Sequence, residues 1–210
     1  MLNQQVVAKI IDALERNIMT KPIVLSLGEL LWDLLPQGKR VGGAPANFAY
    51  HAQCNGAESY VISAVGEDSL GDELVEEVKK AGIKHVIQRN AWPTSTVDVE
   101  LKNGIPEYTI VRNIAWDHIV YTRELVDLVS KADAIYFGTL SLRSQETHDT
   151  VLELLKHTKP NAMKFFDINI RSDHYSKDLI DALLKEATVF KLNDSELLLL
   201  RDMFNIRETS

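Results

Sequence analysis

Hydrophobic residues in this chain follow two patterns with different periods. Short apolar runs alternate with segments whose apolar residues repeat every three or four positions, such as Leu70, Leu74 and Val78. A continuous apolar run is typical of a strand buried on both faces, and the longer period is typical of an amphipathic helix. The runs expected to form strands are 23–27, 60–65, 134–137, 164–167 and 188–191. This alternation predicts an α/β fold with a mainly parallel sheet flanked by helices.

One segment, 94–113, breaks this alternation. Residues 96–101 alternate apolar and polar side chains, Asn103-Gly104 follows, and 108–111 runs back. Asn-Gly between two such runs is a strong signal for a β-hairpin. A hairpin with one apolar face covers an active-site mouth, the same hairpin of a second copy, or a sheet edge. The pattern alone leaves these three alternatives open.

The first residues form a separate element in this interpretation. Val6, Ile10, Leu14 and Ile18 recur every four positions, which predicts an amphipathic helix within 1–22. One hypothesis is that this helix covers an exposed apolar surface. No repeat, linker or low-complexity tract interrupts residues 23–210, so we expect them to form one domain.

Composition and charge narrow the function classes. The chain has 23 Lys and Arg against 30 Asp and Glu, a formal net charge of -7, which disfavours nucleic-acid binding. No apolar run approaches the roughly 20 residues of a membrane span. Cys54 is the single cysteine, and the amino terminus lacks the basic-then-apolar build of a secretory signal. We therefore expect a soluble cytoplasmic protein without nucleic-acid or membrane partners.

The segment Gly-Gly-Ala-Pro-Ala-Asn-Phe-Ala at 42–49 is the most informative for chemistry. Gly42 and Gly43 precede a predicted helix, so the backbone can approach a ligand closely and present its amides. Asn47 would lie in the first helical turn, where its side-chain amide can donate to and accept from a sugar hydroxyl. The alternative is a plain glycine turn in which Asn47 caps the helix.

The wider spacing carries a family resemblance. Gly56 and Gly66 follow the Gly-Gly-x-x-x-Asn-x-Ala segment, and this order resembles the amino-terminal signature of the ribokinase/PfkB carbohydrate kinases, with fructokinase the most similar. The resemblance implies a ribokinase-like fold in which the hairpin forms a small lid. Residues 28–33 resemble the family's first strand, whose last aspartate holds sugar hydroxyls. This assigns substrate binding to Asp33, with a solvated turn aspartate as the alternative.

A second motif follows the predicted strand at 164–167. Asp167-Ile168-Asn169-Ile170-Arg171 resembles the Asp-x-Asn-x-Arg segment of keto-sugar kinases, and open α/β sheets place ligands at such strand ends. Arg171 is expected near the sugar or the phosphoryl group, with a surface salt bridge as the alternative. Arg112, at the end of the hairpin, is a looser candidate for substrate contact.

A third motif, Lys191-Leu192-Asn193-Asp194-Ser195-Glu196, follows the last predicted strand. Asn193 and Glu196 have the spacing of a helix capping box. The segment also resembles the family's Asn-x-x-Glu motif, which implies that Lys191, Asn193 and Glu196 lie near ATP and that Glu196 acts on Mg²⁺ through bound water. Both interpretations can hold together, and no residue is assigned as a direct metal ligand.

The resemblance implies an ATP-dependent phosphotransferase with Mg²⁺, acting on a sugar hydroxyl and forming a homodimer through the lid hairpins. The family's base is an aspartate in a Gly-Ala-Gly-Asp segment, and this sequence contains none. We therefore assign no catalytic base, and we expect an incomplete kinase domain, truncated at its carboxy terminus, with negligible activity. A 2-keto-3-deoxygluconate kinase, a ribokinase, a non-catalytic sugar-binding protein and a fragment of a longer reading frame remain alternatives to fructokinase.

Overall fold

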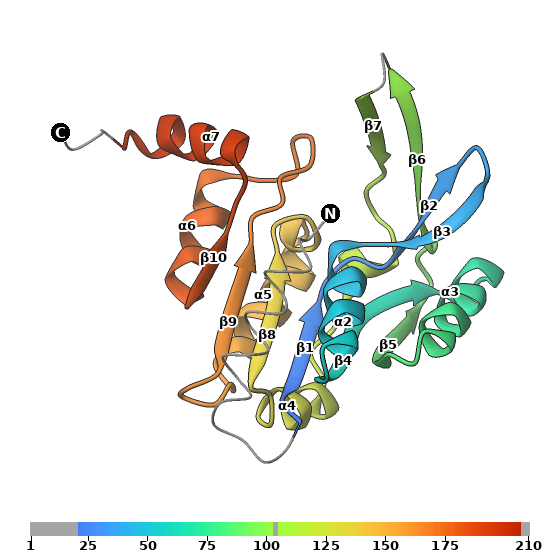
Figure 1. The fold of residues 1–210 in the computed structure, drawn as a ribbon, viewed down its shortest axis with the longest axis horizontal. Helices are drawn as coiled ribbons and strands as arrows, with labels where there is room; N and C mark the ends of the chain where they lie inside the picture. The colour runs from blue at the N-terminus through green and yellow to red at the C-terminus, as the bar shows by residue number, and fades with distance from the viewer. Residues whose placement is uncertain (1–20, 103–104, 207–210) are drawn as a thin grey trace.

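A computed structural model describes residues 21–102 and 105–206 (Figure 1). The predicted helix at 1–22 and the turn at 103–104 lie almost entirely outside these residues. The described part contains a six-stranded sheet flanked by helices and a separate four-stranded sheet that projects from one end of it (Figure 1). The fold class predicted from the sequence is confirmed.

The large sheet is entirely parallel, with strand order β10-β9-β8-β1-β4-β5. Its strands are β1 (Ile23–Leu27), β4 (Glu58–Gly66), β5 (Lys84–Asn90), β8 (Ala134–Gly138), β9 (Met163–Asp167) and β10 (Val189–Lys191). The five predicted strands are confirmed. Strand β5 has no counterpart among the predictions because it is an edge strand of mixed, partly exposed residues rather than an apolar run.

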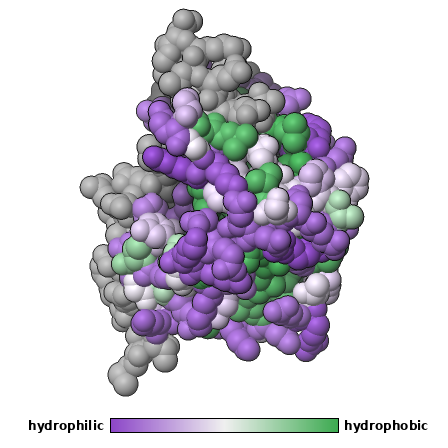
Figure 2. Space-filling view, turned by 90° about the vertical axis from the view of Figure 1, so that its right-hand side faces the viewer, coloured by the Kyte–Doolittle hydropathy of each residue, from purple (hydrophilic) through white to green (hydrophobic). Residues whose placement is uncertain are grey.

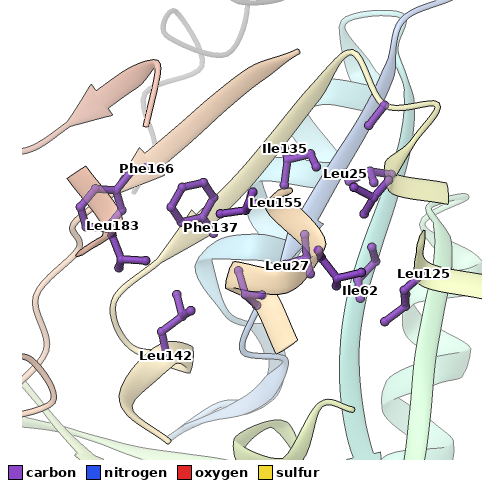
Figure 3. Close-up of a cluster of buried hydrophobic side chains, with 14 of the residues drawn as sticks. Leu25, Leu27, Ile62, Leu125, Ile135, Phe137, Leu142, Leu155, Phe166 and Leu183 are labelled. Carbon is purple, nitrogen blue, oxygen red and sulfur yellow. The ribbon is translucent and has the colours of Figure 1, made fainter. Parts of the chain in front are cut away.

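Helices cover both faces of this sheet, as the alternation of side chains along a strand requires. The helices are α2 (Ala44–Cys54), α3 (Ser69–Lys80), α4 (Arg123–Val129), α5 (Gln145–Leu155), α6 (Lys177–Glu186) and α7 (Asp194–Phe204), with short 3-10 turns η1 (Ala115–His118) and η2 (Ser141–Arg143). Val24 packs with α2, whereas its neighbour Leu25 packs with α4, α5 and α6. Figure 3 shows this second cluster, in which Phe137 and Phe166 stack at 5.6 Å between ring centroids.

The smaller sheet has the order β3-β2-β6-β7 and contains β2 (Leu31–Leu35), β3 (Gly38–Gly42), β6 (Ser95–Lys102) and β7 (Ile105–Ile110). The predicted hairpin is confirmed, since β6 and β7 pair antiparallel from Val97 opposite Ile110. The prediction missed β2 and β3, of which β2 pairs parallel with β6. Asp33 therefore lies within β2, and its placement at the end of the first strand was wrong.

The outer surface over α3 is mostly hydrophilic, with smaller apolar patches (Figure 2). Exposed ion pairs lie along this helix, for example Lys79 with Glu76 and Lys80 with Glu77 at 2.5 and 2.7 Å. No helix within the described ranges is long and apolar enough to cross a membrane.

Candidate active site

A cavity of about 210 Å³ lies where the carboxyl ends of the parallel strands meet the smaller sheet. Open α/β sheets bind ligands at this position because the loops that follow the strands begin there. Five residues identified from the sequence line this one cavity: Asp33, Gly43, Asn47, Arg171 and Lys191. They come from β2, the start of α2, the loop after β9 and the end of β10, so the fold brings together residues that are far apart in sequence.

The remaining candidates lie beside the cavity. Gly42 packs against Asp33, because a Cβ on Gly42 would lie 2.5 Å from Asp33 Oδ2. Arg112 lines a neighbouring cavity of about 410 Å³, where its Nη2 is 4.0 Å from Asp173 Oδ2. Asn193 and Glu196 lie behind the loop that carries Arg171, at the start of α7.

The glycine turn before α2 is fixed by close backbone packing. Gly43 has φ +107°, and a Cβ there would lie 2.3 Å from the backbone oxygen of Glu29. Only glycine fits this position without a shift of the backbone. Gly43 is also the N-cap of α2, and Asn47 is the fourth helical residue. The alternative in which Asn47 caps the helix is therefore wrong, and its exposed side-chain amide stays at the cavity wall.

Glu29 is a cavity residue that the sequence interpretation missed. It is 3% exposed, and its Oε1 accepts a hydrogen bond of 3.1 Å from the backbone N–H of Ala44. Burial raises the pKa of Glu29 to about 7, against the lowering effect of that hydrogen bond and of the nearby Arg171. Its position directly after a buried strand was the signal that could have identified it.

Arg171 links the two carboxyl groups on this side of the cavity electrostatically. Burial raises the pKa of the half-buried Asp33, and the positive charge of Arg171 opposes this rise, as it does for Glu29. Arg171 also donates from Nη1 to the carbonyl oxygen of Ile170 at 3.1 Å, which fixes it relative to its own loop. The cavity thus presents a carboxylate, an amide and a planar cation to a polar ligand.

At the base of the cavity, a buried carboxylate pairs with a partly exposed lysine. Asp167 is 1% exposed, its Oδ1 lies 2.9 Å from Lys191 Nζ, and its Oδ2 accepts a hydrogen bond of 3.0 Å from the Tyr136 hydroxyl. Burial raises the pKa of Asp167, while Lys191 opposes the rise. Burial also raises the pKa of Tyr136 well above its ordinary value, so this hydroxyl remains a donor.

The capping box predicted at the start of α7 is present. Asn193 Oδ1 accepts from the Glu196 backbone N–H at 2.9 Å, and Glu196 Oε2 accepts from the Asn193 backbone N–H at 2.8 Å. Glu196 Oε1 accepts from the backbone N–H of Ile170 at 2.9 Å, which connects α7 to the loop of Arg171. Both carboxylate oxygens therefore bind backbone donors, and each keeps a second lone pair that could accept from a water molecule.

Within the parts of the chain that the structure describes, no group of three or more His, Cys, Asp and Glu side chains is placed to hold a metal ion.

Comparison with known proteins gives a consistent result. The family model described as "pfkB family carbohydrate kinase" matches residues 25–209. A sugar kinase of Pyrococcus horikoshii is 29% identical over 199 residues, which cover 86% of this chain and 64% of the relative. Fructokinase-2 of Oryza sativa subsp. japonica is 28% identical over 197 residues, which cover 83% of this chain and 58% of the relative.

Solved structures show the same similarity. The crystal structure of the Pyrococcus horikoshii sugar kinase superposes with a TM-score of 0.76 at 28% identity, covering 86% of this chain and 66% of that one. Fructokinase from Xylella fastidiosa with bound ATP gives a TM-score of 0.74 at 25% identity, covering 89% and 62%. The chain spans between 58% and 66% of the length of these proteins.

Proposed function

Since the chain belongs to the pfkB family of carbohydrate kinases, we propose that it supplies the sugar-binding site of a kinase that transfers the γ-phosphoryl group of ATP to fructose. The observation that carries this proposal is the convergence of Asp33, Asn47 and Arg171 on one cavity. A carboxylate accepts hydrogen bonds, an amide both donates and accepts, and a guanidinium donates, which together match neighbouring sugar hydroxyls.

Two features support a keto sugar. The Gly-Gly-Ala-Pro-Ala-Asn and Asp-x-Asn-x-Arg segments resemble those of fructokinases, and the similar rice protein is named a fructokinase. A cavity of about 210 Å³ is also smaller than the roughly 300–1,000 Å³ typical of drug-sized ligands, which suits a monosaccharide. A 2-keto-3-deoxygluconate kinase and a ribokinase remain the alternatives within this family.

Phosphoryl transfer depends mainly on positioning and electrostatic stabilisation. In this proposal Asp33 and Asn47 orient the sugar hydroxyls, and Arg171 balances negative charge between the sugar and the phosphates. We assign the start of α7 and the loop beside it to the part of the site that faces the magnesium–ATP substrate. These two segments are held in place by Lys191, Asn193 and Glu196. Arg112 is retained only as a contact for a substrate group that extends toward the neighbouring cavity.

Binding and turnover test this proposal separately. Calorimetry with fructose, ribose and 2-keto-3-deoxygluconate measures sugar affinity, and ADP release from magnesium–ATP measures transfer. Loss of one electrostatic donor commonly costs about 100 to 1,000-fold in rate, and this polypeptide contains no Gly-Ala-Gly-Asp segment. We therefore expect saturable fructose binding with negligible ADP release. Asp33→Asn should weaken binding about tenfold or more, by the loss of charge-assisted hydrogen bonds.

Each other result has a definite meaning. Tighter binding of ribose or 2-keto-3-deoxygluconate than of fructose would contradict the substrate assignment. Absence of sugar binding altogether would contradict the proposed site. Turnover at the rate of an ordinary sugar kinase would show that other groups supply the base, and would contradict the expected lack of activity.

We also propose a cytoplasmic homodimer that forms through the β6-β7 hairpin. In the smaller sheet β7 is an edge strand, and such an edge can pair with another chain. The turn at 103–104 lies outside the described residues. Sedimentation analysis tests this, and a monomer at micromolar concentration would contradict it.

A further inference from the structure

Arg143 is a buried cation close to the cavity that plays no part in the assignments above. It ends η2, directly after β8, and its side chain is 3% exposed. Its Nε and Nη2 donate to the two carboxylate oxygens of Asp117 at 2.9 and 3.0 Å, and Nη2 also donates to the carbonyl oxygen of Val111. The guanidinium lies over the ring of Trp116, 4.3 Å from its centroid.

The remaining nitrogen of this guanidinium faces a histidine. Nη1 of Arg143 lies 3.2 Å from Nε2 of His174, a residue that is 6% exposed. A guanidinium only donates hydrogen bonds and keeps its charge at any accessible pH. His174 Nε2 must therefore accept, so the imidazole is neutral and carries its proton on Nδ1.

These contacts join three segments that each form part of the cavity wall. Val111 directly follows Ile110, the last residue of β7, which lines the cavity. Arg143 follows Leu140, another lining residue, and His174 follows the lining residue Arg171. One buried side chain thus connects the base of the smaller sheet, the end of β8 and the loop after β9.

We propose that Arg143 is a positioning residue that holds these three wall segments in place around the sugar. Its hold on the loop after β9 requires that His174 is neutral. This inference rests on the proposed function, because it assumes that the cavity binds the sugar. Arg143 itself lines the neighbouring cavity and is not among the residues that line the sugar cavity.

The surroundings of His174 favour its neutral form at neutral pH. Burial, Arg143 and Arg112 lower the pKa of His174 below its ordinary 6.5, and the exposed Asp173 opposes them. The other titratable and charged groups that line the same cavity come from five segments: Arg112 after β7, Arg143 on η2, His148 on α5, Asp173 and Tyr175 before α6, and Asp178 on α6. Acidification that protonates His174 would place an N–H of the imidazolium against the guanidinium and break this contact.

Four variants separate positioning from mere packing. His174→Gln keeps an acceptor oxygen for Arg143 but does not titrate. Arg143→Lys keeps the charge but loses the paired bonds to Asp117, and Arg143→Met removes both. Arg123→Met is the matched control, because Arg123 forms only an exposed pair with Asp127. Fructose affinity is measured by calorimetry from pH 5.5 to 8, and hydrogen exchange is measured for 105–118 and 168–176.

We expect the fructose dissociation constant of the wild type, divided by that of His174→Gln, to rise between pH 7.5 and 5.5, by about three- to tenfold, because the lowered pKa of His174 leaves part of it neutral at pH 5.5. This ratio cancels the titration of other groups in the cavity. Arg143→Lys should weaken binding about tenfold at pH 7.5, and Arg143→Met should accelerate exchange in both segments, while Arg123→Met should change neither quantity.

A constant ratio across this pH range, together with unchanged exchange at 168–176 in Arg143→Met and Arg143→Lys, would overturn the inference. If the wild type binds no sugar, the proposed function fails. The positioning role of Arg143 is then tested by hydrogen exchange alone. If acid accelerates exchange at 168–176 in the wild type but not in His174→Gln, the contact between Arg143 and His174 holds this loop. Equal exchange in both proteins would overturn the inference. If Arg143→Met does not fold, the inference is tested in the same way with Arg143→Lys and His174→Gln.

Discussion

The carboxylate of Glu29 accepts a hydrogen bond from the backbone N–H of Ala44, the first residue of α2. The backbone oxygen of Glu29 also closes over Gly43, leaving no room for a Cβ. One residue therefore fixes both the turn and the start of the helix that carries Asn47. Its carboxyl group is buried, so its protonation is linked to the stability of this part of the cavity.

Glu29→Gln should change the pH dependence of stability. The pKa of Glu29 rises from 4.5 to about 7 on folding, so the folded state binds more protons between these values and the wild type loses stability as pH rises through them. Glutamine keeps an acceptor for Ala44 and does not ionise. One pKa unit corresponds to about 1.36 kcal/mol. Between pH 4 and 8, the unfolding free energy of Glu29→Gln should therefore rise by about 3 kcal/mol relative to that of the wild type.

Urea unfolding at these two pH values measures this difference directly. The comparison with the wild type removes the contributions of all other titrating groups that the substitution leaves unchanged. Equal stability differences at both pH values would show that Glu29 is not protonated in the folded protein near neutral pH.

Two glycines allow backbone strain to be separated from steric overlap. Gly43 and Gly38 both have positive φ, +107° and +123°, but a Cβ on Gly38 would meet no atom within 4 Å. Gly38→Ala should therefore cost only the strain, about 1–3 kcal/mol of unfolding free energy. Gly43→Ala should cost more and should also weaken fructose binding, because the turn must move away from Glu29. Thermal unfolding and calorimetry check this, and equal effects of both substitutions would contradict it.

Most strands of the main sheet could be predicted from the sequence because they are continuous apolar runs. Strand β5 was missed because its residues are mixed and partly exposed, and the β2–β3 pair was missed because 28–33 was assigned to the first strand and β3 is mostly exposed. Asp33, Asn47 and Arg171 could be identified from local motifs. Glu29 follows a predicted strand, but its burial and its bond to Ala44 could not be predicted, and the role of Arg143 depends on partners that only the tertiary structure brings together.

Lys191→Met should be strongly destabilising because it leaves the Asp167 carboxylate buried without its cation. Removing one partner of a fully buried ion pair typically costs about 3–5 kcal/mol, and we expect the lower end of this range because Lys191 is partly exposed. The loss should be smaller at pH 4 than at pH 8, since protonation removes the buried charge, and an added Asp167→Asn should recover part of it. Lys185→Met is the control, because its pair with Asp181 is exposed and contributes about 0.5 kcal/mol or less. Similar losses in both Lys variants would contradict the importance of the buried pair.

Glu196→Ala should loosen the loop of Arg171 as well as the start of α7. Glu196 accepts from the backbone N–H groups of both Asn193 and Ile170, whereas the Asn193 side chain bonds only within the capping box. Asn193→Ala should therefore cost the usual 0.5–2 kcal/mol of a lost cap, roughly, without exposing Ile170. Glu196→Ala should cost about 1–3 kcal/mol more, because a second backbone donor loses its partner.

Hydrogen exchange at the Ile170 amide distinguishes the two variants. We expect fast exchange at Ile170 in Glu196→Ala and slow exchange in Asn193→Ala, with fructose affinity reduced only in the first. Such a result would mean that α7 holds Arg171 against the sugar cavity through one carboxylate, so the start of α7 and the sugar site are mechanically coupled. Slow exchange at Ile170 in both variants would mean that the loop keeps its position without Glu196, and the coupling would have to be abandoned.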